Sequence, residues 1–187
     1  MLELAGACTR FVQARYGVAL DFDPDTLSLL DQWVHDAREA REEGPTMDLV
    51  QAAAGAYLGE VIRRQFGGTW HAPEGFGTWA DWRLCLAPVY CAFNPIGMAR
   101  EALLLEPQDG WHAHFELDPA EADAVEARLA ALPQVEENEY YAPSTRYDVV
   151  CIVVEALRES LRARGLGDVS FTAEDYADSL PPAQTLN

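Results

Sequence analysis

Hydrophobic residues recur along this chain at helical spacing, then at strand spacing, and then at helical spacing again. The helical pattern predicts six helices, at residues 2–16, from Pro24 onward, and at 47–66, 95–105, 119–132 and 145–164. Three of these helices follow an Asp-Pro or Asn-Pro pair, at Asp23, Asn94 and Asp118. Asp and Asn are favoured N-caps and Pro suits the first helical position, so these pairs indicate where helices start.

The strand pattern lies in four short segments rich in Trp, Tyr, Val and Phe, at residues 69–72, 82–87, 89–93 and 111–117. They predict an antiparallel sheet of three to five strands. A chain of this length buries a sufficient core as one domain. We therefore expect a single α+β domain over residues 1–187, with helices packed on one face of the sheet and a peripheral tail at 179–187.

The helix predicted at 47–66 contains two glycines four residues apart, Gly55 and Gly59. A glycine inside a helix costs about 0.5–1 kcal/mol relative to alanine, so we expect another helix or the sheet to approach the backbone closely there. Glu60 follows directly and can pair with Arg63 or Arg64 on the same helix. These three residues form either an ion pair or a clamp for an anion, because arginine binds carboxylate and phosphate through two hydrogen bonds.

Three stretches of the chain resemble a group of bacterial proteins that have no established activity. The stretches are "LDFDPDTLSLLD", "GAYLGEVIRRQFGGTW" and "FNPIGMAREAL", and the group shares the pattern Gly-x-Tyr-Leu-Gly-Glu-Val followed by Gly-Gly-x-Trp. The resemblance runs from about Leu20 to Leu105. It implies a bacterial stand-alone domain, and it assigns no functional residue.

The chain carries a formal net charge of −18, and all 13 of its Lys and Arg residues are arginine. The lack of lysine excludes a P-loop nucleotide site and a Schiff-base enzyme. The negative charge disfavours binding to nucleic acid and to anionic membranes. Two acidic segments, 118–129 and 134–145, would instead attract a basic protein partner.

Residues 1–17 have the pattern of an amphipathic helix and lack the basic start of a signal peptide. No segment approaches the roughly 18 consecutive apolar residues of a transmembrane helix. We therefore expect a cytoplasmic protein, without a cofactor.

The four cysteines are scattered and form no CxxC pair, so we expect them to be reduced, buried and inert; they are Cys8, Cys85, Cys91 and Cys151.

The segment "WHAHFEL" holds the candidate metal ligands. On a strand, His112, His114 and Glu116 point to one face, while the apolar residues between them point to the other. Two imidazoles and a carboxylate suit zinc or iron, and a further ligand, such as His71, would come from elsewhere in the chain. A half-buried strand without any metal produces the same alternation.

Two further groups of residues have a functional and a structural interpretation. Cys85 or Cys91 could meet His71 or a histidine of the segment 111–117 to form a nucleophilic pair, although burial in a strand explains both cysteines. Phe76 and Trp79 belong to the glycine-rich segment 73–82, and they form either an exposed contact loop or part of the core.

The sequence favours a non-catalytic module that binds another protein. In this hypothesis the acidic helices steer a basic partner and the aromatic loop anchors it. One alternative is a metal-dependent hydrolase that uses the histidine strand. The other is a sensor of small anions, with a pocket between the sheet and the glycine helix and with Arg63 or Arg64 holding the anion.

Overall fold

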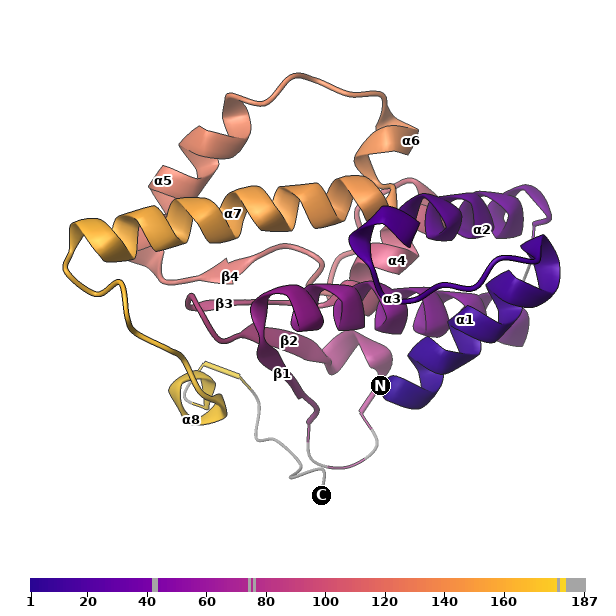
Figure 1. The fold of residues 1–187 in the computed structure, drawn as a ribbon, viewed down its shortest axis with the longest axis horizontal. Coiled ribbons are helices and arrows are strands. Elements are labelled where there is room, and N and C mark those ends of the chain that lie inside the picture. Colours follow the sequence, from indigo (N-terminus) through magenta and orange to yellow (C-terminus); the bar gives the residue numbers. More distant parts are fainter. Residues whose placement is uncertain (42–43, 74, 76, 178, 181–187) are drawn as a thin grey trace.

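The computed structural model describes residues 1–41, 44–73, 75, 77–177 and 179–180. These residues form a single α+β fold with one open antiparallel sheet, as predicted, and with eight α-helices where six were predicted (Figure 1). The helices are α1 Leu2–Tyr16, α2 Leu27–Glu39, α3 Pro45–Phe66, α4 Pro95–Leu104, α5 Pro119–Ala130, α6 Glu137–Tyr140, α7 Pro143–Ala163 and α8 Ala173–Tyr176. Two short 3₁₀ helices, Pro24–Thr26 and Trp79–Asp81, precede α2 and the second strand.

The sheet contains four strands in chain order, β1 Gly68–His71, β2 Arg83–Leu86, β3 Cys91–Phe93 and β4 Glu116–Leu117. Every neighbouring pair is antiparallel, and Thr69, Cys85, Ala92 and Glu116 form one row across the sheet. Leu84 and Phe93 lie in the adjacent row and belong to the main core beneath the long helices.

Helix α3 is the centre of the core, because every residue from 50 to 62 is buried. A helix that is buried on all sides must accept neighbours around its whole circumference. A Cβ atom on Gly55 would lie 2.3 Å from the Cα atom of Ile96 in α4, and one on Gly59 would lie 2.3 Å from the indole ring of Trp70 in β1. The predicted close approach at both glycines is confirmed.

A second, smaller cluster covers the other face of the sheet. Cys85 and Ala92 pack there against Tyr176 of α8 and against Leu180. The Tyr176 hydroxyl accepts a hydrogen bond from the Cys91 N–H at 2.9 Å and lies 2.8 Å from the carbonyl oxygen of Leu86. Of the tail predicted at 179–187, Leu180 is therefore buried, and residues 181–187 lie outside the described residues.

The three predicted helix starts are confirmed. The side chains of Asp23, Asn94 and Asp118 each accept a hydrogen bond from the backbone N–H two residues further along. Asp23 caps the 3₁₀ turn before α2, whereas Asn94 and Asp118 cap α4 and α5 directly.

The strand predicted at 111–117 is wrong over most of its length, because only Glu116 and Leu117 form strand pairs. The partner strand β3 ends at Phe93, where the chain turns into α4, so residues 111–114 have no strand to pair with. His112 instead has a φ of 50°.

None of the helices in the described part of the chain is both long and apolar enough to cross a membrane.

Candidate functional site

A cavity of about 1150 Å³ lies beneath the segment that joins β4 to α7. We call this segment, residues 119–142, the arch; it contains α5, an extended connection and α6. In Figure 1 the arch passes over α7 and returns to its N-terminal end. The cavity slightly exceeds the range of about 300–1,000 Å³ that is usual for small-molecule sites.

Few side chains fasten the arch to the rest of the molecule. Val125 and Glu121 are buried against α7, and Glu121 accepts a hydrogen bond from Arg164 at 2.6 Å. Beyond α5 the arch is largely exposed, including Val135 and Tyr140, which line the cavity with 47% and 44% of their surface accessible. The arch thus presents apolar side chains to the cavity, and no other part of the described structure buries these side chains.

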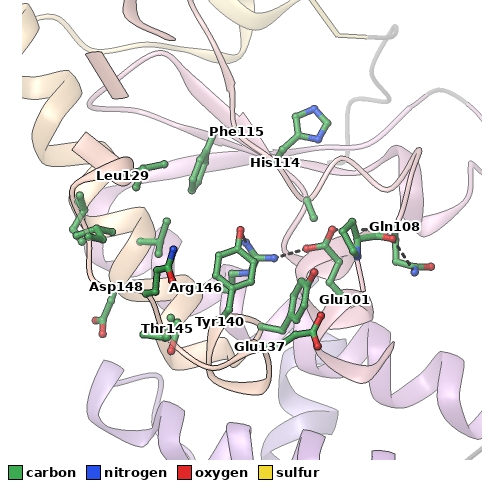
Figure 2. Close-up of a pocket in the computed structure, with 18 of the residues that line it drawn as sticks. Glu101, Gln108, His114, Phe115, Leu129, Glu137, Tyr140, Thr145, Arg146 and Asp148 are labelled. Atoms are coloured by element: carbon green, nitrogen blue, oxygen red, sulfur yellow. Dashed lines mark hydrogen bonds and ion pairs between the residues drawn. The ribbon is translucent and has the colours of Figure 1, made fainter. Parts of the chain in front are cut away.

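The cavity wall combines aromatic and aliphatic side chains from segments far apart in the sequence. Figure 2 shows Phe115 and His114 on one side of the cavity, with Tyr140 and Thr145 across from them. The apolar lining residues are Pro107, Ala113, Phe115, Leu129, Ala130, Leu132, Pro133, Val135, Tyr140, Tyr141, Val149 and Ile152. Such a mixed apolar and aromatic wall is typical of sites for organic molecules.

A buried ion pair forms the floor of the cavity. Arg146 of α7 donates a hydrogen bond to Glu101 of α4 at 2.5 Å, as the dashed line in Figure 2 marks. The backbone N–H of Gln108 also donates to Glu101, at 3.2 Å. The guanidinium of Arg146 lies 4.4 Å from the ring centre of Tyr140 and 5.2 Å from that of Tyr141. These contacts connect α4, α6 and α7, and they hold the side chains of Glu101 and Arg146 in place.

Carboxylates predominate among the charged groups of the cavity. Glu101, Asp109, Glu137 and Asp148 line it, and Arg146 is the one arginine among its lining residues. Because Arg146 is already paired with Glu101, the unbalanced charge of the wall is negative. A ligand with a positive charge is favoured there over an anion.

The three predicted metal ligands meet beside this cavity, although only Glu116 lies on a strand. One ligand atom from each of His112, His114 and Glu116 lies within 4.8 Å of the others. His112 Nδ1 lies 2.8 Å from Glu116 Oε1, and His114 lines the cavity. His71, the further ligand considered, lies on β1 opposite Arg83.

Glu60 and Arg63 form the ion pair that the sequence suggested, with a distance of 2.9 Å between Arg63 Nη2 and Glu60 Oε2. Trp70 Nε1 also donates to Glu60, at 2.8 Å. Burial opposes ionisation of Glu60, but the hydrogen bonds from Arg63 and Trp70 outweigh it and lower the pKa of the carboxyl. The charge of Arg64 also lowers the pKa of Glu60, while its guanidinium lies over Phe22, 3.7 Å from the ring centre.

Trp79, one of the two predicted aromatic anchors, is half-buried. Its ring centre lies 5.6 Å from that of Trp82, which in turn lies 6.5 Å from that of Trp70. Trp79 therefore belongs to a cluster of tryptophans beside the sheet. Phe76, the other anchor, lies outside the described residues.

All four cysteines are free, as expected, and three of them are buried. Burial raises the pKa of Cys85 to about 12 and raises that of Cys91 further still. A thiol with so high a pKa is a poor nucleophile near neutral pH, because the thiolate is the reactive form. The two cysteines therefore fit the structural interpretation.

Only weak signals in the sequence point to the cavity, and none of the sequence-based expectations includes it. Helix α5 was predicted, but only two of its residues, Glu121 and Val125, are buried. The helix therefore forms one side of the cavity and does not fill it with side chains. The connection and α6 contain a run of carboxylates with Tyr140 and Tyr141, which resembles an ordinary solvated loop. The buried partner of Arg146, Glu101, lies 45 residues away along the chain, a separation at which local spacing carries no information.

Comparisons with known proteins add no assignment, since no protein-family model, curated protein or solved structure matches this chain. The resemblance to a group of bacterial proteins over Leu20 to Leu105 therefore stays a prediction.

Proposed function

We propose that this protein binds a small organic cation with an apolar body in the cavity beneath the arch. The observation that carries the proposal is the cavity itself, about 1150 Å³ with aromatic side chains and an excess of carboxylates in its wall. The apolar body would cover the exposed surfaces of Val135 and Tyr140. The positive charge would lie near Asp109, Glu137 and Asp148, the lining carboxylates other than Glu101.

Binding without catalysis is the simplest activity that this arrangement supports. Glu101 pairs with Arg146 and also accepts a hydrogen bond from the Gln108 backbone, so these contacts hold the floor of the cavity in place. The arch is attached mainly through α5 and α6, and its exposed middle section can adjust to a ligand without disturbing the core. A binding protein or sensor for organic cations fits both features.

The proposal is tested with two probes of similar shape and opposite charge, tetraphenylphosphonium and tetraphenylborate. Calorimetric titration of the intact protein should show saturable 1:1 binding of the cation. The anion should bind at least about tenfold more weakly, because the wall carries more carboxylates than arginines.

Two matched variants locate the binding. Ala130 ends α5 at the cavity, and Ala163 ends α7 away from it. Ala130→Trp fills part of the cavity and should weaken binding of tetraphenylphosphonium by about tenfold or more, whereas Ala163→Trp should leave it unchanged. Equal affinities of both variants and the wild type would contradict the proposal, and so would preference for the anion.

The hypothesis of a protein-binding module stays a prediction. Its support is the net charge of −18 and the acidic arch, which would steer a basic partner. The same carboxylates serve the cation proposal, so a basic peptide segment that inserts into the cavity would satisfy both.

A further inference from the structure

Three potential metal ligands converge on the loop that leads into β4. His112, His114 and Glu116 each place one ligand atom within 4.8 Å of the others. In a tetrahedral zinc site with bonds of about 2.0–2.1 Å, ligand atoms lie roughly 3.3 Å apart, so small side-chain rotations would complete the set. We propose that these residues bind one zinc ion at the rim of the arch cavity.

The loop is held in place by α4, independently of any strand pairing. The backbone N–H of Asn94 donates to the His112 carbonyl at 2.8 Å. A Cβ atom on Gly97 would lie 2.4 Å from the Trp111 carbonyl oxygen, which shows how closely the loop packs on α4. Arg100 lies over the Trp111 ring, at 4.6 Å from its centre. These contacts fix the backbone that carries the two histidines.

The backbone at His112 adopts a conformation that is uncommon outside glycine. Its φ of 50° directs the chain away from a straight strand. His114 follows after Ala113, which is buried with 3% of its surface accessible and anchors the loop between the two histidines. The two imidazole ring centres lie 5.9 Å apart as a result. Unusual backbone conformations occur often at functional sites, and here one brings together groups that bind metals.

Glu116 is oriented by a buried arginine. Arg83 Nε donates to Glu116 Oε1 at 3.0 Å, and Arg83 Nη1 donates to the carbonyl oxygens of Ala80 and Trp82 at 2.9 Å each. Arg83 has only 3% of its surface accessible, so this arrangement is rigid. Carboxylates and imidazoles that bind metals are commonly held by such a second partner.

The donor set selects the kind of ion. Arg83 offsets much of the negative charge on Glu116, which leaves the two imidazole nitrogens as the main attraction for a metal ion. Zinc accepts nitrogen ligands readily, whereas magnesium and calcium prefer sites made of oxygen. Three protein ligands leave a coordination position open for water or another small ligand.

Calorimetric titration of the intact, chelator-treated protein with zinc tests this site without reference to any cavity ligand. Zinc should bind with a 1:1 stoichiometry, and neither magnesium nor calcium should compete at a tenfold excess. Cobalt, which reports its coordination by visible absorption, should give the spectrum of a four-coordinate ion.

Variants at the ligands and at a distant histidine assign the site. His114 is exposed, so His114→Ala preserves the fold, and His112→Asn keeps a residue type that tolerates the positive φ. Each should weaken zinc binding by about tenfold or more, while His35→Ala, on the exposed surface of α2, should not change it.

Two results would overturn the proposal. One is zinc binding that is equally strong in the wild type, His114→Ala and His112→Asn. The other is no binding by the wild type at millimolar zinc. Either result leaves the cavity proposal standing, because its own test measures the binding of organic probes and does not involve zinc.

Discussion

Gly55 and Gly59 let α3 lie against its neighbours at distances that a side chain would prevent. The neighbour of Gly55 is the backbone of Ile96, whose Cα atom lies 2.3 Å from the ideal Cβ position. The neighbour of Gly59 is the rigid indole ring of Trp70. The sequence alone indicated both close approaches, because two glycines inside one apolar helix have a cost that packing must offset.

Gly55→Ala should destabilise the protein by about 1–3 kcal/mol, because the backbone of α4 has to move to admit one methyl group. Gly6→Ala in α1 is the matched control, since its Cβ would meet only the flexible end of Arg10, at 3.4 Å. That variant should be neutral or up to about 1 kcal/mol more stable. Urea denaturation measures both changes, and equal effects at the two glycines would refute the packing argument.

Glu60 should make the stability of the protein depend on pH in the acidic range. Its folded pKa lies below the ordinary value of 4.5, so the carboxylate stabilises the fold above that pH. The stabilisation is lost as the pH falls through the lowered folded pKa. Glu60→Gln should therefore cost about 1–3 kcal/mol at pH 7 and much less at about pH 3.

Denaturation curves of the wild type and Glu60→Gln at both pH values measure this difference. Glu155→Gln, at an exposed position of α7, is the control and should have little effect at either pH. A cost of Glu60→Gln that is the same at both pH values would show that the ion pair with Arg63 does not stabilise the fold.

At the scale of the elements, helix caps and apolar spacing within each segment made the long helices predictable. The caps at Asp23, Asn94 and Asp118 and the apolar spacing of α1, α3 and α7 identified the long helices. The short elements α6 and α8 were missed, because a helix of four residues has no periodicity to detect.

The segment at 111–117 shows where local patterns fail. Its alternation of polar and apolar residues is that of a strand, but α4 begins at Pro95 and removes the partner strand. The three metal-ligand candidates nevertheless meet, through a loop bent at His112. The prediction that His112, His114 and Glu116 lie close together is confirmed. The strand that was predicted to carry all three is wrong.

Tyr176→Phe tests how α8 is attached to the sheet. The Tyr176 hydroxyl is buried and binds the Cys91 N–H, which would lose its partner, so the variant should lose about 1–3 kcal/mol of stability. Tyr90 stacks on Tyr176 at 4.6 Å, but its hydroxyl contacts Ser179 in an exposed position. Tyr90→Phe should therefore cost much less, and thermal unfolding of the two variants compares them. A smaller loss for Tyr176→Phe than for Tyr90→Phe would contradict this role of the hydroxyl.

At the scale of the whole molecule, the structure shows where part of the excess of acidic residues lies. The net charge of −18 suggested a basic partner, without indicating which part of the molecule would meet it. The structure places Glu101, Asp109, Glu137 and Asp148 around one cavity. These residues come from α4, the loop after it, α6 and α7, so only the tertiary structure reveals them as one group.

The most direct test of the central proposal is to locate the bound organic cation by NMR. Titration of isotope-labelled protein with tetraphenylphosphonium should shift the amide signals of cavity residues such as Ala113, Leu129, Tyr141 and Val149. Signals from α1 and from the buried centre of α3 should stay in place. Shifts that are absent, or that are spread evenly over the acidic surface, would contradict a binding site beneath the arch.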